Sequence, residues 1–122
     1  MATVFTHAGK AIVTNRITGA GTEPKYVAWG TGAGTAAVGD TTLFTEAPEA
    51  RTNGTSSRVT TTQPNDTYRV VGTITASAGR TITNAGTFDA AAAGNICVKG
   101  DFSGIVLSLG DSIQFTVDLQ FT

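Results

Sequence analysis

Few residues in this chain have the type and spacing that catalysis or metal binding requires. His7 is the only histidine and Cys97 the only cysteine. A hydrolase triad could use His7 as its base, but the sequence contains no Gly-x-Ser-x-Gly nucleophile motif. A zinc site would have to combine His7 with Cys97 and carboxylates, and no closely spaced pair of ligands is present. We therefore predict no catalytic residue and no metal site, and we expect that the protein is not an enzyme.

Two further candidate chemistries are also weakly supported. The glycines Gly30, Gly32 and Gly34 follow a predicted strand, as the glycines of a phosphate-binding loop do, but neither G-x-G-x-x-G nor Gly-Lys-Ser/Thr is present. We interpret residues 30–39 as a flexible loop of small residues, and we predict no cofactor. Cys97 lies in the apolar run Ile96-Cys97-Val98, which is typical of a buried, inert thiol rather than of a nucleophile.

The composition predicts one domain, spanning residues 1–122, with a weakly charged surface. Hydrophobic residues make up 40% of the 122 residues, whereas charged residues make up 14%, compared with about 25% in typical domains. The net charge of −1 argues against a nucleic-acid partner. A nearly neutral surface favours association with other proteins. No apolar run is long enough to span a membrane, and the N-terminus lacks the pattern of a signal peptide, so we expect no membrane partner.

The last thirteen residues, Gly110 to Thr122, carry the clearest structural signal. From Ser112 onward every even position is polar and every odd position from Ile113 to Phe121 is apolar. This period of two predicts a strand with one face on a core and the other in water. A helix is excluded because a period of 3.6 would scatter these apolar residues around its whole circumference.

The N-terminal region is predicted to contain a short extended segment and the only helix. Residues 1–6 read as an extended arm in which Thr3, Val4 and Phe5 could add a strand to a partner's sheet. The alternative is that Thr3–Phe5 form an ordinary edge strand of this domain. His7 to Thr18 reads as a helix that ends before Gly19, and a strand at Ile12-Val13-Thr14 is the alternative.

The remainder predicts strands separated by turns. We expect strands over Lys25–Trp29, Ser57–Gln63, Thr67–Ser77, Arg80–Asn84, Asn95–Lys99 and Gly104–Leu109. The turn Gln63–Asp66 joins two of them as a hairpin, and Gly100-Asp101 forms another turn. A helical turn is expected after Asp40, which would cap it. About seven strands with regular turns predict a single antiparallel β-sandwich, mainly β, with one short N-terminal helix. This pattern does not distinguish a jelly-roll-like from an immunoglobulin-like topology.

The aromatic residues divide into two groups. Trp29, Phe88, Phe102, Phe115 and Phe121 fall on or beside predicted strands, and we expect them to form the core. Phe5 and Phe44 lie outside clear strands. Because aromatic residues are enriched at interfaces, one of these two is a candidate anchor for a partner, although the core remains the alternative.

Three segments together carry a resemblance to known proteins. They are Lys25–Asp40 (KYVAWGTGAGTAAVGD), Tyr68–Ala76 (YRVVGTITA) with Ile82–Asp89 (ITNAGTFD), and Leu109–Phe115 (LGDSIQF). Their order resembles a group of small structural proteins of tailed bacteriophages. It is also similar to the capsid cement, or decoration, proteins, which bind phage heads as β-sandwich or jelly-roll domains. The resemblance covers most of the chain from Lys25 onward, and its motifs are structural rather than catalytic.

The resemblance implies a non-enzymatic virion protein that binds the outer surface of the assembled head and stabilises the junctions between capsomers. Its implied partners are the major capsid protein and further copies of itself, as a homodimer or homotrimer. Its implied location is the capsid surface, and the host cytoplasm during assembly. Some relatives are tail proteins, so a tail or tail-fibre component is the first alternative. A carbohydrate-binding or host-adhesion module is the second, and it would require exposed aromatic platforms.

Overall fold

The computed structural model describes all residues from Met1 to Thr122. It contains one helix and eight strands in the order β1-α1-β2-β3-β4-β5-β6-β7-β8. Their bounds are β1 Thr3–Phe5, α1 His7–Ile17, β2 Tyr26–Gly30, β3 Thr52–Asn53, β4 Thr55–Val59, β5 Thr67–Thr75, β6 Arg80–Phe88, β7 Ile96–Leu107 and β8 Ser112–Gln120. The prediction of a mainly β protein with one short N-terminal helix is confirmed.

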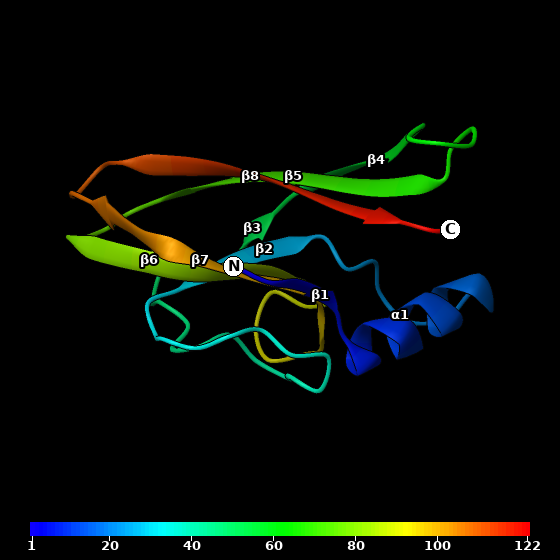
Figure 1. The fold of residues 1–122 in the computed structure, drawn as a ribbon, viewed down its shortest axis with the longest axis horizontal. Coiled ribbons are helices and arrows are strands. Elements are labelled where there is room, and N and C mark those ends of the chain that lie inside the picture. The colour runs from blue at the N-terminus through cyan, green and yellow to red at the C-terminus, as the bar shows by residue number, and fades with distance from the viewer.

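The strands form two antiparallel sheets that face each other (Figure 1). One sheet has five strands in the order β1-β7-β6-β2-β3, and the other has three in the order β4-β5-β8. The chain passes from β5 to β6 and from β7 to β8 at the same end of the two sheets. There the Ala76 N–H donates to the Asp111 carbonyl, and the Gly110 N–H donates to the Ala76 carbonyl. The sandwich-like arrangement predicted from the sequence is therefore present.

The main core lies between the two sheets. β5 contributes Val70 and Ile74, which face Val27 and Trp29 of β2. The Trp29 ring meets Phe115 of β8 edge to face, with ring centroids 6.4 Å apart. These side chains belong to the faces that the period-two pattern places inward, and Trp29 and Phe88 are buried as predicted.

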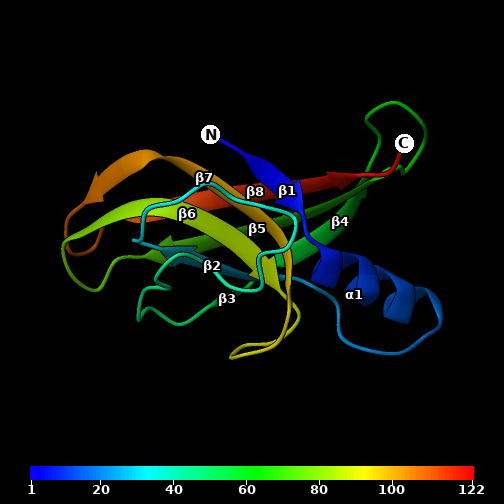
Figure 2. The same ribbon diagram turned by 60° about the horizontal axis from the view of Figure 1, so that its bottom comes forward.

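The outer face of the five-stranded sheet is also covered. The segment between β2 and β3 crosses this face, and Leu43 packs there against Ala28, Phe88 and Ile96 (Figure 2). No helix forms after Asp40, so the predicted helical turn is wrong. The Asp40 carboxylate instead accepts a hydrogen bond from the Ala37 N–H (3.0 Å) and another from Lys99 Nζ (2.9 Å).

β7 is one continuous strand, so the predicted turn at Gly100-Asp101 is wrong. Both of its edges are paired at this point, because Gly100 lies opposite Thr3 of β1 and Ala85 of β6. The Asp101 carboxylate also accepts a bond from the Ala36 N–H at 2.7 Å. Pairing on both edges keeps Gly100-Asp101 extended, although this dipeptide favours a turn in isolation.

The N-terminal segment forms part of the domain. Thr3–Phe5 pair with β7 as the edge strand of the five-stranded sheet, so these residues adopt the second of the two predicted alternatives and not a free arm. Thr6 then caps α1, since its Oγ1 accepts a bond from the Gly9 N–H (2.9 Å) and donates to the Ile96 carbonyl (2.7 Å). This helix has neither the length nor the apolar character that crossing a bilayer requires.

β8 pairs with β5 over its whole length without a register shift. Leu119 is buried and Ile113, Phe115 and Val117 are half-buried, so the predicted inward face is correct. Phe121 follows the end of the strand and is 49% exposed, so its assignment to the core is wrong.

Candidate partner-binding surface

The predicted partner-binding residues lie in two separate places. Thr3, Val4 and Phe5 form β1, at one edge of the five-stranded sheet. The Phe5 ring meets Phe121 edge to face, with centroids 6.5 Å apart, so it lies beside the C-terminal end of β8. Phe44 lies in the segment that covers the outer face of the same sheet, where its carbonyl accepts a bond from the Gly32 N–H.

Phe44 is held within the domain. The Lys99 ammonium lies 3.3 Å from the centre of its ring, and Asn84 bonds both its N–H and its carbonyl at 3.0 Å. The glycines of the predicted flexible loop pack closely against Phe44. A Cβ added at Gly30 would lie 2.5 Å from the Phe44 carbonyl oxygen, and a Cβ added at Gly34 would lie 2.7 Å from the Phe44 ring. Phe44 therefore packs the loop onto the sheet, which is the core alternative.

The free edge of β1 offers little backbone for a partner. Thr6 N–H bonds to the Cys97 carbonyl, and Asp101 N–H bonds to the Ala2 carbonyl. These bonds place the even-numbered residues of this segment in the ladder with β7, and only Thr3 and Phe5 direct their backbone groups outward. The helix begins two residues after Phe5, so a strand added here would gain few hydrogen bonds.

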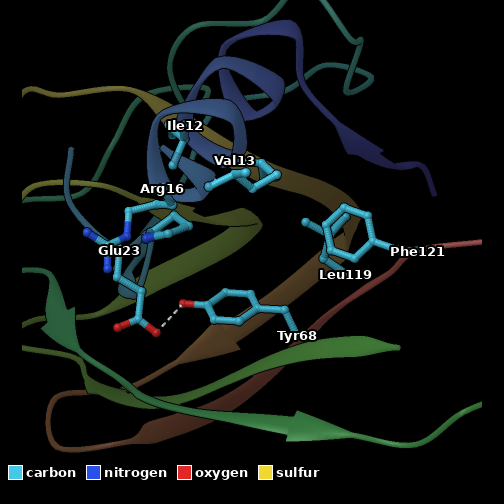
Figure 3. A pocket seen from close by; sticks show the side chains of 9 residues that line it. Ile12, Val13, Arg16, Glu23, Tyr68, Leu119 and Phe121 are labelled. Carbon is cyan, nitrogen blue, oxygen red and sulfur yellow. Dashed lines mark hydrogen bonds between the residues drawn. The ribbon is translucent and has the colours of Figure 1, made fainter. Parts of the chain in front are cut away.

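A groove between α1 and the end of the three-stranded sheet is the most apolar depression on the surface (Figure 3). It has a volume of about 420 Å³. We call it the α1 groove, and its lining comprises Ile12, Val13, Arg16, Ile17, Glu23, Pro24, Tyr68, Leu119 and Phe121. Helix, loop and strand residues from both ends of the chain meet here, so the groove exists only in the folded protein.

The floor of the α1 groove is ordered by a polar contact. Tyr68 Oη donates to Glu23 Oε1 at 3.0 Å, as the dashed line in Figure 3 shows. Burial, followed by the nearby Glu23 charge, raises the pKa of the Tyr68 phenol above its ordinary value. A side-chain hydrogen bond from Ser56 lowers the pKa of Glu23, with further lowering by Tyr68 and by the charges of Lys25 and Arg16. Glu23 is therefore a carboxylate at neutral pH, and its hydrogen bond fixes the position of the Tyr68 side chain in the lining of the groove.

The rim of the α1 groove is unusually exposed for apolar residues. The Ile17 side chain is 81% exposed at the last turn of α1, and Phe121 is 49% exposed beyond β8. An open apolar depression with exposed apolar rims can hold an apolar anchor of another protein. The sequence predicts neither residue as part of a surface site, because Ile17 falls inside the predicted helix and Phe121 continues the alternation of the last strand. The only available signal was their position, just before a helix end and at the end of a strand.

The residues first considered for catalysis lie apart from this groove. His7 is exposed at the first residue of α1, and no group of three or more histidine, cysteine or acidic residues gathers anywhere in the chain. Cys97 is buried as predicted, and burial, with a smaller contribution from the Asp89 charge, raises the pKa of its thiol to about 12. The thiol is thus protonated at neutral pH and shielded from reagents.

Comparisons of the chain with models of protein families, with curated proteins and with solved structures gave no match.

Proposed function

We propose that this chain is a non-enzymatic decoration protein of a bacteriophage head, and that the α1 groove receives an apolar anchor of the major capsid protein. The observation that carries the proposal is the open apolar groove with the exposed Ile17 and Phe121 at its rim. The sequence resemblance supplies the class of particle, and the low charge of the chain suits a permanent position in an assembly.

The mechanism follows from mass action. A protein that binds the assembled lattice and not the separate subunits lowers the free energy of the lattice by RT ln(1 + [L]/Kd) for each occupied site. Each buried apolar anchor contributes about 1.5–3 kcal/mol, and several contacts around one capsomer junction add to it. Binding at symmetry axes further favours a homodimer or homotrimer, with the same groove used in every copy.

The position of the aromatic residues favours this function over carbohydrate binding. Sugar sites present flat aromatic faces to solvent, whereas Trp29 is 1% exposed and donates its Nε1–H to Glu49 Oε1 at 2.9 Å. Tyr68 is half-buried, and its hydroxyl is bonded to Glu23. Trp29 is therefore closed to a glycan, and Tyr68 lies in the lining of the α1 groove rather than on a flat exposed platform.

Binding to particles tests the role of the groove. Phage heads that lack the protein would be incubated with the purified wild-type chain or with Ile17→Gln, and bound protein would be measured after sedimentation of the particles. Because the Ile17 side chain loses its apolar contact, we expect at least tenfold weaker binding. Val106→Gln is the matched control, since Val106 is 79% exposed but lies on β7 near the opposite end of the sandwich. Equal binding by both variants would remove the α1 groove from the interface, and no binding by the wild type would contradict the proposed function itself.

A further inference from the structure

The free edge of β8 carries a row of backbone groups without partners. Phe121 N–H bonds to the Asp66 carbonyl at 2.9 Å, and Ala76 N–H bonds to the Asp111 carbonyl at 2.8 Å. These two bonds fix the phase of the ladder, so that odd-numbered residues of β8 bond to β5 and even-numbered residues direct their N–H and C=O groups away from it. The outward residues are Ser112, Gln114, Thr116, Asp118 and Gln120, and none of their backbone groups has a partner.

β8 also lacks the features that normally protect an edge strand. Natural edges are blocked by lysine, proline, bulges or short length. β8 has nine residues, contains no lysine or proline, and pairs with β5 without a bulge. Its one charged residue, Asp118, is held by Arg69 of β5, with two nitrogen–oxygen distances of 2.8 and 2.9 Å. The opposite edge strand, β4, is shorter, with five residues.

A hollow lies beside this edge of the three-stranded sheet. The hollow has a volume of about 210 Å³ and lies between β8, β7 and β1. Phe102, Phe115 and Val117 supply its apolar walls, and Gly86 and Gly100, which lack side chains, form part of its lining. Phe115 and Val117 are only half-buried, whereas Val70 and Ile74 in the adjacent β5 are almost completely buried. A fourth strand beside β8 would place its inward side chains in this hollow.

The geometry of this flank argues against a second copy as the occupant. β1 lies beyond β7 at the edge of the five-stranded sheet (Figure 2). Met1 and Thr3 line the hollow together with Thr116 of β8. Two copies that joined their β8 edges about a two-fold axis would each bring a projecting β1 into the other. A single extended segment has no second sheet and avoids this clash.

We infer that the β8 edge binds an extended, uncharged segment of another protein chain as a fourth strand. The segment alternates apolar residues, which enter the hollow, with polar residues, which join Gln114 and Thr116 on the solvent face. It is uncharged because Arg69 already neutralises Asp118, and the Asp101 carboxylate is bound by the Ala2 and Ala36 amides. This surface is distinct from the α1 groove, and the inference does not depend on the proposed function.

Residue-specific hydrogen exchange with a defined peptide tests the inference. The probe is a capped synthetic peptide with the sequence of residues 112–120 in which Asn replaces the aspartate of position 118, because it has the required alternation and no charge. Amide exchange of the whole protein would be measured by NMR with and without a saturating amount of this peptide. We expect the amides of the five outward residues to exchange at least tenfold more slowly, while the odd-numbered amides of β8, already bonded to β5, change little.

Two controls separate strand addition from apolar contact. The same peptide with its five central residues N-methylated keeps its side chains but lacks the backbone donors, so binding is expected to be lost. In the protein, Thr116→Pro removes one outward N–H without breaking the ladder with β5, and it should weaken peptide binding at least tenfold, whereas Thr116→Val should not. Unchanged exchange at millimolar peptide would overturn the inference. Protection of the same amides by self-association of the protein alone would overturn the choice of a separate chain as occupant.

Discussion

Glu49 holds a buried polar junction, and its replacement provides a quantitative check of the structure. The Glu49 side chain is 5% exposed. Its carboxylate accepts bonds from Trp29 Nε1 (2.9 Å), from the Ser77 N–H (3.0 Å) and hydroxyl (2.7 Å), and from Arg80 Nε (2.8 Å). The junction ties the segment before β3 to the indole of the core and to the corner between β5 and β6.

Glu49→Gln keeps the size of the side chain but removes the charge and one acceptor oxygen. Whichever way the amide is oriented, its NH₂ group faces donors, so bonds to Trp29 or to Ser77 and Arg80 are lost. Hydrogen bonds to charged groups contribute about 1.5–3 kcal/mol each, so we expect the free energy of unfolding to fall by about 2–4 kcal/mol at pH 7. Urea denaturation would show this as a decrease in midpoint of about 1–2 M with an unchanged slope.

The pH dependence of this difference identifies the carboxylate as its source. Burial raises the pKa of Glu49, but hydrogen bonds from Arg80, Ser77 and Trp29 outweigh burial and hold the pKa well below its ordinary value of 4.5. The stabilisation is therefore present above pH 4.5 and is lost as the pH falls toward the pKa of the folded state. At pH 3 the difference in free energy of unfolding between the wild type and Glu49→Gln should be about 2 kcal/mol smaller than at pH 7. A difference below about 0.5 kcal/mol at pH 7, or one that does not change with pH, would refute the reasoning.

Three further predictions concern packing, reactivity and charge. Gly30→Ala places a Cβ 2.5 Å from a backbone carbonyl and should lower stability by about 1–3 kcal/mol in thermal unfolding, whereas Gly39→Ala, with nothing within 4 Å, should change it little; equal effects would contradict the packing of the loop. Cys97, buried and with a pKa raised to about 12, should resist Ellman's reagent at pH 8 in the folded protein and react fully in urea; rapid reaction without urea would contradict its burial. Asp118→Asn breaks an ion pair whose partners are 37% and 40% exposed, so the loss should stay below about 1 kcal/mol and shrink in 1 M salt, and a larger, salt-independent loss would show that the pair is buried.

The sequence predicts the strands whose two faces meet different surroundings. β5 and β8 each have one face in the core and one in solvent, so their alternation shows both the strand and its inward residues. β7 breaks this rule because both faces of its central part are covered and both edges are paired. Gly100-Asp101 there reads as a turn on local preference, and only the neighbouring strands make it extended.

Features that depend on distant contacts could not be predicted from the sequence. Lys99 reads as a surface charge, yet its side chain is 1% exposed, because Asp40 and the Thr42 carbonyl accept its hydrogen bonds at 2.9 and 2.8 Å. The α1 groove joins α1 with the end of β8, and local patterns do not bring such remote segments together. Phe5, which the sequence analysis singles out, lies beside Phe121 of this groove, but only the fold brings the two residues together.

The number of copies per particle tests the proposed decoration function most directly. Virions of the phage proposed to encode the chain would be purified and analysed by quantitative mass spectrometry, with the major capsid protein as the internal standard. A decoration protein on lattice axes predicts a simple, fixed ratio to the capsid protein and hundreds of copies per head, as an order of magnitude set by lattice symmetry. A few to a few tens of copies would contradict it in favour of a tail component, and absence from the particles would contradict any role in the virion.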